Sequence, residues 1–222
     1  MIKALFFDID DTILDYDLCA EFTVRKACET LRVPYSEAVQ REYRLVDDLL
    51  WARQKAGELT IPRVLELRNA HMMEYLGLTD GMSFQEAFIG AFEESCALVE
   101  GAEDVLRAVK ERGLPVYSAS NGFLNVQTNR LEKAGVLQYF DRLFVSETIG
   151  YEKPHIRFFE HCLRETGHAP HEVLMIGDSI AADIKGGLNA GWNVVYLNRH
   201  NKPSGLDCRE IKTLTELLSV IT

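Results

Sequence analysis

The chain has 222 residues, of which 47% are apolar and 26% charged, as in an ordinary globular protein of one large domain or a domain with an insertion. Its formal net charge of −10 argues against nucleic-acid polymers as partners, because proteins usually bind these through basic patches. No apolar run approaches the roughly 18 residues that a membrane-spanning helix needs, so we expect no membrane partner. The five cysteines are scattered and form no Cys-x-x-Cys pair, which favours free thiols in a reducing cytoplasm.

Short apolar runs, rich in β-branched and aromatic residues, alternate with helical patterns along most of the chain. The runs predict strands at residues 3–8, 115–120, 142–147, 172–178 and 193–198. Helical patterns lie between them, at about residues 102–112, 124–135, 155–167 and 181–190. Buried strands that alternate with helices predict an α/β fold with a doubly wound, Rossmann-like parallel sheet.

Residues 15–98 interrupt this alternation, because they carry helical patterns throughout and no convincing strand. One of these helices begins with a capping-box pattern formed by Ser83 and Glu86. We therefore expect an α-helical cap domain at residues 15–98, inserted after the first strand into an α/β catalytic core of residues 1–14 and 99–222.

Acidic residues crowd together directly after the first predicted strand, where five aspartates lie within residues 8–17. Asp8, Ser120 and Asp178 each close an apolar run. Ligands of open parallel sheets bind beyond the carboxyl ends of the strands. These three residues are therefore expected to converge at one crevice.

Four ordered motifs resemble those of the haloacid dehalogenase superfamily. They are FFDIDDTIL at residues 6–14, SNG at 120–122, YEKP at 151–154 and GDSIAAD at 177–183. The resemblance spans nearly the whole chain, and four motifs in family order are much more specific than one Asp-x-Asp pair. It implies a phosphomonoester hydrolase that acts through an aspartyl-phosphate intermediate on a small phosphorylated metabolite. The sequence indicates no oligomeric state.

The resemblance also implies a role for each motif residue. Asp8 would be the nucleophile, and Asp10 would protonate the leaving oxygen and then activate water against the phosphoenzyme. Lys153 would neutralise the nucleophile and the phosphate. Thr12 would fix the loop by hydrogen bonds, and Ser120 would bond a phosphate oxygen. Together with Asn121, these two residues are the expected substrate-binding residues of the core.

A metal ion is expected because several acids would otherwise face a phosphate dianion. Two like charges 4 Å apart repel by about 4 kcal/mol at an effective dielectric near 20. A hard divalent cation with oxygen ligands, namely Mg²⁺, would offset this repulsion. By resemblance its ligands are Asp8, the backbone carbonyl of Asp10, and Asp178, while Asp183 orients a metal-bound water or a ligand.

Other functions share parts of this pattern. A sugar-phosphate or phosphoglycolate-type phosphatase, or a phosphomutase, can use the same core. A phosphoacceptor signalling domain also has an aspartyl-phosphate site, but it lacks both an acid two residues later and a long helical insertion. The dehalogenase branch of the superfamily lacks the acid at Asp10 and needs no metal. Asp10 and the helical segment at 15–98 therefore favour a phosphatase.

Within the superfamily the chain looks closest to the capped pyrimidine 5′-nucleotidase branch. The local features are SNGF at residues 120–123, LW at 50–51, GELT at 57–60 and GDSIAADIKGGLNAG at 177–191. They imply nucleoside 5′-monophosphates as substrates. Asp47 stands where this branch is expected to carry asparagine, and a carboxylate cannot donate a hydrogen bond as an amide does. The base that is recognised is therefore left open.

The helical segment contains a second group of candidate residues. Tyr43, Asp47 and Trp51 share one helix face at i, i+4 and i+8, and Arg68 lies on the apolar stripe of another helix. In a functional hypothesis, an Asp47–Arg68 pair beside aromatic surface helps the cap close over the leaving group of the substrate, with Trp51 also at the substrate. In a structural hypothesis, Trp51 belongs to the core, Asp47 pairs with Arg44 or Arg68, and the head of Arg68 reaches water.

Overall fold

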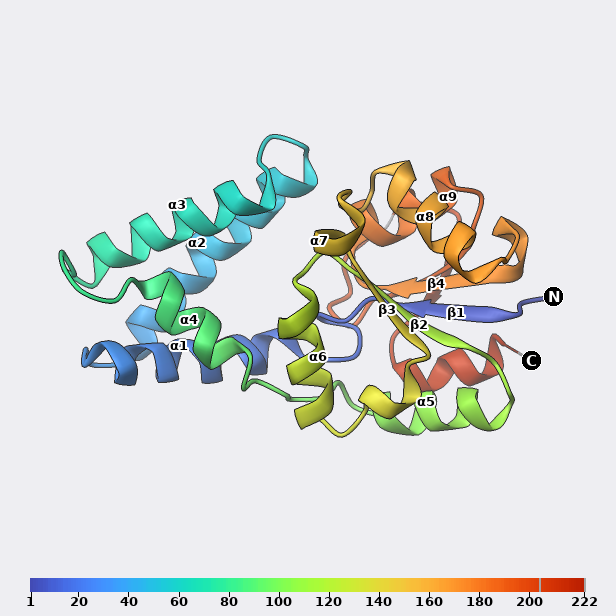
Figure 1. Cartoon of the computed structure of the whole chain (residues 1–222), viewed down its shortest axis with the longest axis horizontal. Coiled ribbons are helices and arrows are strands. Elements are labelled where there is room, and N and C mark those ends of the chain that lie inside the picture. The colour runs from blue at the N-terminus through green and yellow to red at the C-terminus, as the bar shows by residue number, and fades with distance from the viewer. Residues whose placement is uncertain (204, 222) are drawn as a thin grey trace. The chain divides into compact units, whose positions relative to one another are not determined.

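The chain divides into two compact units in a computed structural model, which describes residues 1–203 and 205–221. One unit comprises Met1–Tyr16 and Cys96–Thr222, and the other comprises Asp17–Ser95. Figure 1 shows that the first is built around a sheet and the second from helices. The predicted α/β fold is therefore confirmed.

The sheet of the first unit contains six parallel strands in the order β3-β2-β1-β4-β5-β6. Their bounds are β1 Ala4–Phe7, β2 Val116–Ser120, β3 Arg142–Val145, β4 Val173–Gly177, β5 Asn193–Leu197 and β6 Arg209–Ile211. The sequence predicted the first five. It missed β6, an edge strand of three residues, two of them exposed, because so short a segment shows no apolar run. The strand order reverses between β1 and β4, which is where ligands bind in such sheets.

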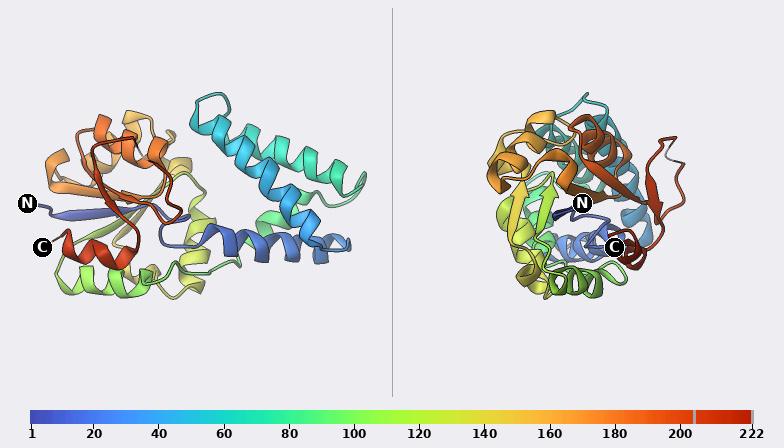
Figure 2. Two further views of the ribbon diagram at one scale, coloured as in Figure 1. Left: turned by 180° about the vertical axis from the view of Figure 1, so that it is seen from behind. Right: turned by 90° about the vertical axis from the view of Figure 1, so that its right-hand side faces the viewer.

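Helices cover both faces of this sheet, as the doubly wound prediction requires. They are α5 Ala102–Glu111, α6 Leu124–Lys133, α7 Ser146–Ile149, α8 Ile156–Thr166 and α9 Gly186–Asn189. Figures 1 and 2 show α8 and α9 on one side of the sheet and α5 on the other.

The helix predicted at residues 181–190 is divided into two parts. It begins as a π-helical turn, Ile180–Lys185, and only then continues as α9. A Cβ atom at Gly186 would lie 2.7 Å from the ring of Phe159, and one at Gly187 would lie 2.8 Å from a methyl group of Val194. The two glycines therefore allow the backbone to pack closely against α8 and β5.

Aromatic side chains fix β1 in the middle of the sheet. The ring of Phe6 lies 4.6 Å from that of Trp192 and 4.9 Å from that of Tyr117, measured between centroids. Phe6 has no exposed surface, and burial of a Phe side chain stabilises a fold by about 1.5–3 kcal/mol. This packing holds the end of β1, and with it Asp8, in a defined position.

The segments that precede and follow the helical unit are paired with each other inside the sheet-containing unit. Leu14 forms an isolated antiparallel bridge with Leu98. The Val99 N–H donates to the carbonyl of Ile13 at 2.9 Å. The chain therefore leaves this unit and re-enters it at neighbouring points.

The helical unit contains α1 Tyr16–Leu31, whose first residue belongs to the other unit, α2 Glu37–Lys55, α3 Ile61–Tyr75 and α4 Phe84–Phe92. Figure 2 shows α2 and α3 side by side. The predicted capping box is confirmed, because the Ser83 hydroxyl accepts from the Glu86 N–H at 3.2 Å and the Glu86 carboxylate accepts from the Ser83 N–H at 2.8 Å. Within the described part of the chain, no helix has the length and apolar character needed to cross a bilayer.

Candidate active site

Three carboxylates meet at the carboxyl edge of the sheet. Asp8 follows β1, Asp178 follows β4, and Asp183 lies on the π-helical turn Ile180–Lys185. One carboxylate oxygen from each lies within 4.8 Å of the others. The ends of neighbouring parallel strands thus bring Asp8 and Asp178 together, as expected from the sequence.

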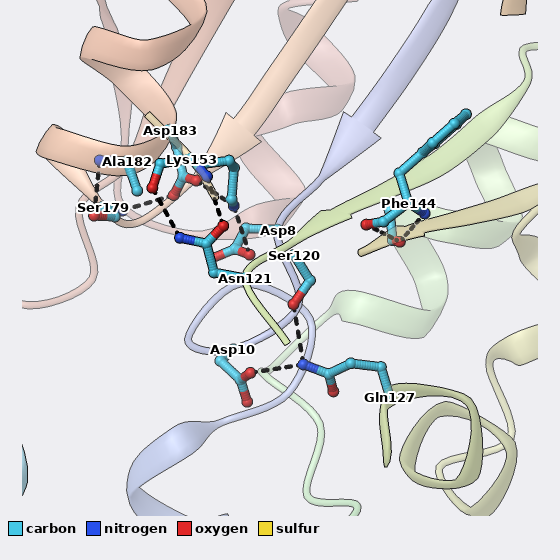
Figure 3. A network of polar contacts seen from close by, with 11 residues as sticks. Asp8, Asp10, Ser120, Asn121, Gln127, Phe144, Lys153, Ser179, Ala182 and Asp183 are labelled. Carbon is cyan, nitrogen blue, oxygen red and sulfur yellow. Dashed lines mark hydrogen bonds and ion pairs between the residues drawn. The ribbon is translucent and has the colours of Figure 1, made fainter. Parts of the chain in front are cut away.

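The Lys153 ammonium lies among these acids (Figure 3). Its Nζ atom donates to Asp8 Oδ1 at 2.9 Å and to Asp183 Oδ1 at 2.5 Å. The Lys153 side chain is 2% exposed and that of Asp183 is fully buried. The other oxygen of Asp183 accepts from the Ser179 N–H at 2.9 Å, so Asp183 holds the lysine beside Asp8.

Asn121 fixes the backbone of the lysine. Its Oδ1 accepts from the Lys153 N–H at 2.7 Å, and its Nδ2 donates to the Lys153 carbonyl at 2.9 Å. The side-chain amide thus joins the loop after β2 to the loop that carries the lysine. Binding of substrate by Asn121, which the motif implied, stays a prediction.

Burial and charge set the protonation of this cluster. Burial, followed by the negative charge of Asp183, raises the pKa of the Asp8 carboxyl to about 7, while Lys153 acts in the opposite direction. Burial alone would lower the pKa of Lys153, but the charges of Asp183 and Asp8 outweigh it and raise that pKa above its ordinary value. Lys153 is therefore a permanent cation at neutral pH, and additional positive charge would favour the ionised, nucleophilic form of Asp8.

The residues of the cluster fit a divalent cation. Asp8, Asp178 and Asp183 supply only oxygen donors, which hard cations such as Mg²⁺ prefer. This donor set agrees with the metal site that the sequence predicted.

Gly177 leaves the space that Asp183 occupies. A Cβ atom at this position would overlap the carboxylate and would lie 2.7 Å from the Cβ of Asp183. A side chain at residue 177 would therefore displace the carboxylate that holds Lys153.

Asp10 is engaged by a separate set of partners. Arg130 Nη1 donates to Asp10 Oδ1 at 2.7 Å, and Gln127 Nε2 donates to Asp10 Oδ2 at 2.9 Å. Gln127 Nε2 also donates to the Ser120 hydroxyl at 3.0 Å (Figure 3). The candidate acid and the candidate phosphate-binding hydroxyl are therefore linked through one amide.

The sequence analysis missed Gln127 and Arg130, although a signal was present. They are buried on the same face of α6 as the apolar residues Val126 and Leu131. Large polar side chains rarely occupy such a face without a specific partner. The sequence pattern could have indicated that the two residues are unusual, but it could not have identified Asp10 as their partner.

The hydrogen bond of Thr12 within the loop comes from its backbone, whose N–H donates to the Ile9 carbonyl at 3.4 Å, and not from its hydroxyl. The Thr12 side chain is fully buried, and its Oγ1 has no hydrogen-bond partner within the described part of the chain. Backbone bonds close the loop instead, because the Ile9 carbonyl accepts from the N–H groups of Ile13 and Leu14, each at 2.9 Å. Binding of substrate by Thr12 stays a prediction.

The candidate residues of the helical unit form a buried ion pair. Arg68 Nη1 donates to Asp47 Oδ1 at 2.9 Å, with side-chain exposures of 3% and 1%. The indole of Trp51 donates to the same Asp47 oxygen at 3.1 Å, and the guanidinium also bonds to the Tyr43 hydroxyl at 3.1 Å. The Cζ atom of Arg68 lies 4.3 Å from the centroid of the Phe88 ring.

Two parts of the structural hypothesis for this group are wrong. The head of Arg68 does not reach water, because a carboxylate and aromatic rings surround it. Trp51 is only partly buried rather than a core residue. Binding of substrate by Asp47, Trp51 and Arg68 remains a prediction.

A parallel sheet with acids and a buried lysine at its carboxyl edge places the protein among enzymes with an α/β core. The sequence matches the haloacid dehalogenase-like hydrolases over residues 2–191, and the chain belongs to this family. The resemblance that the four motifs indicated is confirmed.

Individual relatives match over nearly the full chain. YfnB of Bacillus subtilis (strain 168), which bears the name HAD-hydrolase, is 30% identical over 99% of this chain and 95% of its own. Its crystal structure bound to magnesium superposes with a TM-score of 0.91 and covers 100% of this chain and 99% of that one. The pyrimidine 5′-nucleotidase YjjG of Escherichia coli (strain K12) is 32% identical over 91% of this chain and 89% of its own. A glyceraldehyde 3-phosphate phosphatase of Methanothermobacter thermautotrophicus (strain Delta H) is 26% identical over the full length of both chains.

Gly177→Ala tests the close contact with Asp183. The new methyl group should displace the buried carboxylate and lower the free energy of unfolding by about 1–3 kcal/mol, as overpacking usually does. Thermal and urea unfolding measure the loss. Gly90→Ala is the matched control, because a Cβ at Gly90 meets nothing within 4 Å. Equal stabilities of the two variants would contradict the steric argument.

Proposed function

We propose that the protein is a Mg²⁺-dependent phosphomonoester hydrolase that forms an aspartyl-phosphate on Asp8. The observation that carries the proposal is the position of Asp8, which lies among the oxygens of Asp178 and Asp183 and 2.9 Å from Lys153 Nζ. A nucleophilic carboxylate, a cationic side chain and metal-binding oxygens are the groups that phosphoryl transfer requires.

Each residue of the cluster has a defined task in this reaction. The Asp8 carboxylate attacks phosphorus, and the Lys153 ammonium stabilises the negative charge of Asp8 and of the phosphoryl oxygens. Asp8, Asp178 and the Asp10 carbonyl would hold Mg²⁺, which would supply positive charge near the phosphoryl group. Asp183 orients Lys153 and this set of ligands.

Asp10 carries the proton through both halves of the reaction. In the first half it gives a proton to the leaving oxygen as the bond from Asp8 to phosphorus forms. In the second half it takes a proton from the water that attacks phosphorus, and Asp8 is released. One water is consumed, and an alcohol and inorganic phosphate are produced.

Nucleoside 5′-monophosphates are the proposed substrates, with the unit Asp17–Ser95 as the cap that selects the leaving group. The 5′-nucleotidase YjjG and the motifs shared with that branch support this choice. The glyceraldehyde 3-phosphate phosphatase, which aligns over its full length, supports a sugar-phosphate or related small substrate as the second candidate. None of the five cysteines forms a disulfide bond with another described residue, which fits the proposed location in the cytoplasm.

Metal removal tests the proposed hydrolase as a whole. Activity on p-nitrophenyl phosphate and on nucleoside monophosphates should vanish in EDTA and return with excess Mg²⁺. The reason is that the carboxylates of Asp8, Asp178 and Asp183 then regain the positive charge of the metal ion. Phosphate release measures both states, and protein given EDTA already saturated with Mg²⁺ is the control. Full activity of a metal-free preparation would exclude the proposal.

Asp8→Asn and Asp10→Asn separate the nucleophile from the acid and base. Asp8→Asn should form no phosphoenzyme, because an amide does not attack phosphorus as a carboxylate does. Asp10→Asn should slow turnover by about 10²–10⁴-fold, the usual contribution of general acid–base catalysis. Rapid-quench labelling distinguishes the two, with Asp104→Asn as an exposed control (69% side-chain exposure). Small, equal losses in both variants would refute these roles.

Asp47→Asn tests whether the buried pair of the helical unit affects specificity. Stability should fall in any case, because the buried Arg68 guanidinium loses its counter-charge. If the pair shapes the substrate site, the ranking of kcat/KM among nucleotides, hexose phosphates and phosphoglycolate should also change, while Mg²⁺ dependence remains. A lower Tm with an unchanged ranking would make the pair purely structural.

A further inference from the structure

A buried arginine on α6 serves the loop that carries Asp10. Among the described residues, Arg130 is the largest with a fully buried side chain, and it donates to an Asp10 carboxylate that is 33% exposed. A buried guanidinium is expensive to desolvate, and replacing a buried ion pair by apolar side chains is often neutral or stabilising. Packing alone therefore does not explain why an arginine holds this aspartate.

The two oxygens of Asp10 are held by different donors. Arg130 binds Oδ1 with a permanent positive charge, whereas the neutral amide of Gln127 binds Oδ2. Arg130 also donates to Gln127 Oε1 at 3.0 Å, which turns the amide nitrogen toward Asp10. The guanidinium and the amide thus fix the two oxygens of Asp10 separately and hold the carboxylate in one orientation.

The same amide nitrogen bonds to the end of β2. Gln127 Nε2 donates to the Ser120 hydroxyl, whose own proton remains available to another acceptor. Gly122 gives this contact its space, because a Cβ there would lie 3.0 Å from Gln127 Nε2 and 3.3 Å from Ser120 Oγ. The amide is thus fixed between the acid and the hydroxyl expected to bind phosphate.

We propose that Gln127 and Arg130 are positioning residues that hold Asp10 for both of its proton transfers. The inference rests on the proposed function. The Asp10 carboxyl gives a proton to the leaving oxygen as the bond from phosphorus to that oxygen breaks and the bond to Asp8 forms. Arg130 and Gln127 hold the resulting carboxylate in place, and it later accepts a proton from the attacking water as the Asp8–phosphorus bond breaks.

The dependence of the rate on the leaving group separates positioning from a structural role. Proton donation to the leaving oxygen accelerates the reaction little when the leaving phenol is acidic. Its contribution to the rate grows as the pKa of the leaving phenol rises. For Gln127→Leu and Arg130→Met, kcat/KM should fall by about 10²-fold or more with phenyl phosphate and by less than about tenfold with p-nitrophenyl phosphate. Arg130→Lys, which keeps the cation, should restore part of the loss. Asp10→Asn should give the same steep dependence.

Ser118→Ala is the matched control for the loss of a buried polar contact. The Ser118 hydroxyl is buried on β2 and bonds to the backbone of Phe144, so the variant should keep the wild-type ratio between the two esters. Should Arg130→Met fail to fold, Gln127→Leu and Arg130→Lys still give the comparison. Equal losses on both esters would overturn the inference and leave the hydrolase proposal standing. A wild-type protein that hydrolyses neither ester with Mg²⁺ would reject the proposed function and the inference with it.

Discussion

The contacts of the Lys153 ammonium with Asp8 and Asp183 are the interaction on which the rest of the site depends. Burial destabilises the anion of Asp8, and even with Lys153 beside it the pKa of this carboxyl is raised to about 7. Several features of the core then follow from the need to hold one ammonium in place. Asn121 is hydrogen-bonded to both the N–H and the carbonyl of Lys153, and Gly177 leaves the space that the Asp183 carboxylate occupies.

Asp8 and Asp10 show how one short loop separates two carboxylates chemically. They are two residues apart in the chain, yet the first shares a lysine with Asp183 and the second is bound by an arginine and an amide. Different surroundings are what allow two acids of the same type to take different roles in one reaction. The residue between the two acids is fixed as well, because the Ile9 carbonyl accepts hydrogen bonds from the N–H groups of Ile13 and Leu14.

The sequence was most informative where local pattern and topology act together. Apolar runs ending in Asp8, Ser120 and Asp178 were enough to place these residues at one edge, since parallel strands align their carboxyl ends. Interactions between distant segments were less accessible. Gln127 and Arg130 could be recognised as unusual on a buried helix face, but their partner depends on how α6 docks against a loop more than 110 residues earlier in the chain.

The paired segments around Leu14 and Leu98 have an evolutionary consequence. Because the insertion begins and ends at neighbouring points, its length and sequence can change without moving any strand. The described residues of both polar networks around Asp8 and Asp10 belong to the sheet-containing unit. The helical insertion can therefore be exchanged during evolution while the residues around Asp8 and Asp10 stay the same. Relatives that catalyse one reaction can thus differ in the substrates that they recognise.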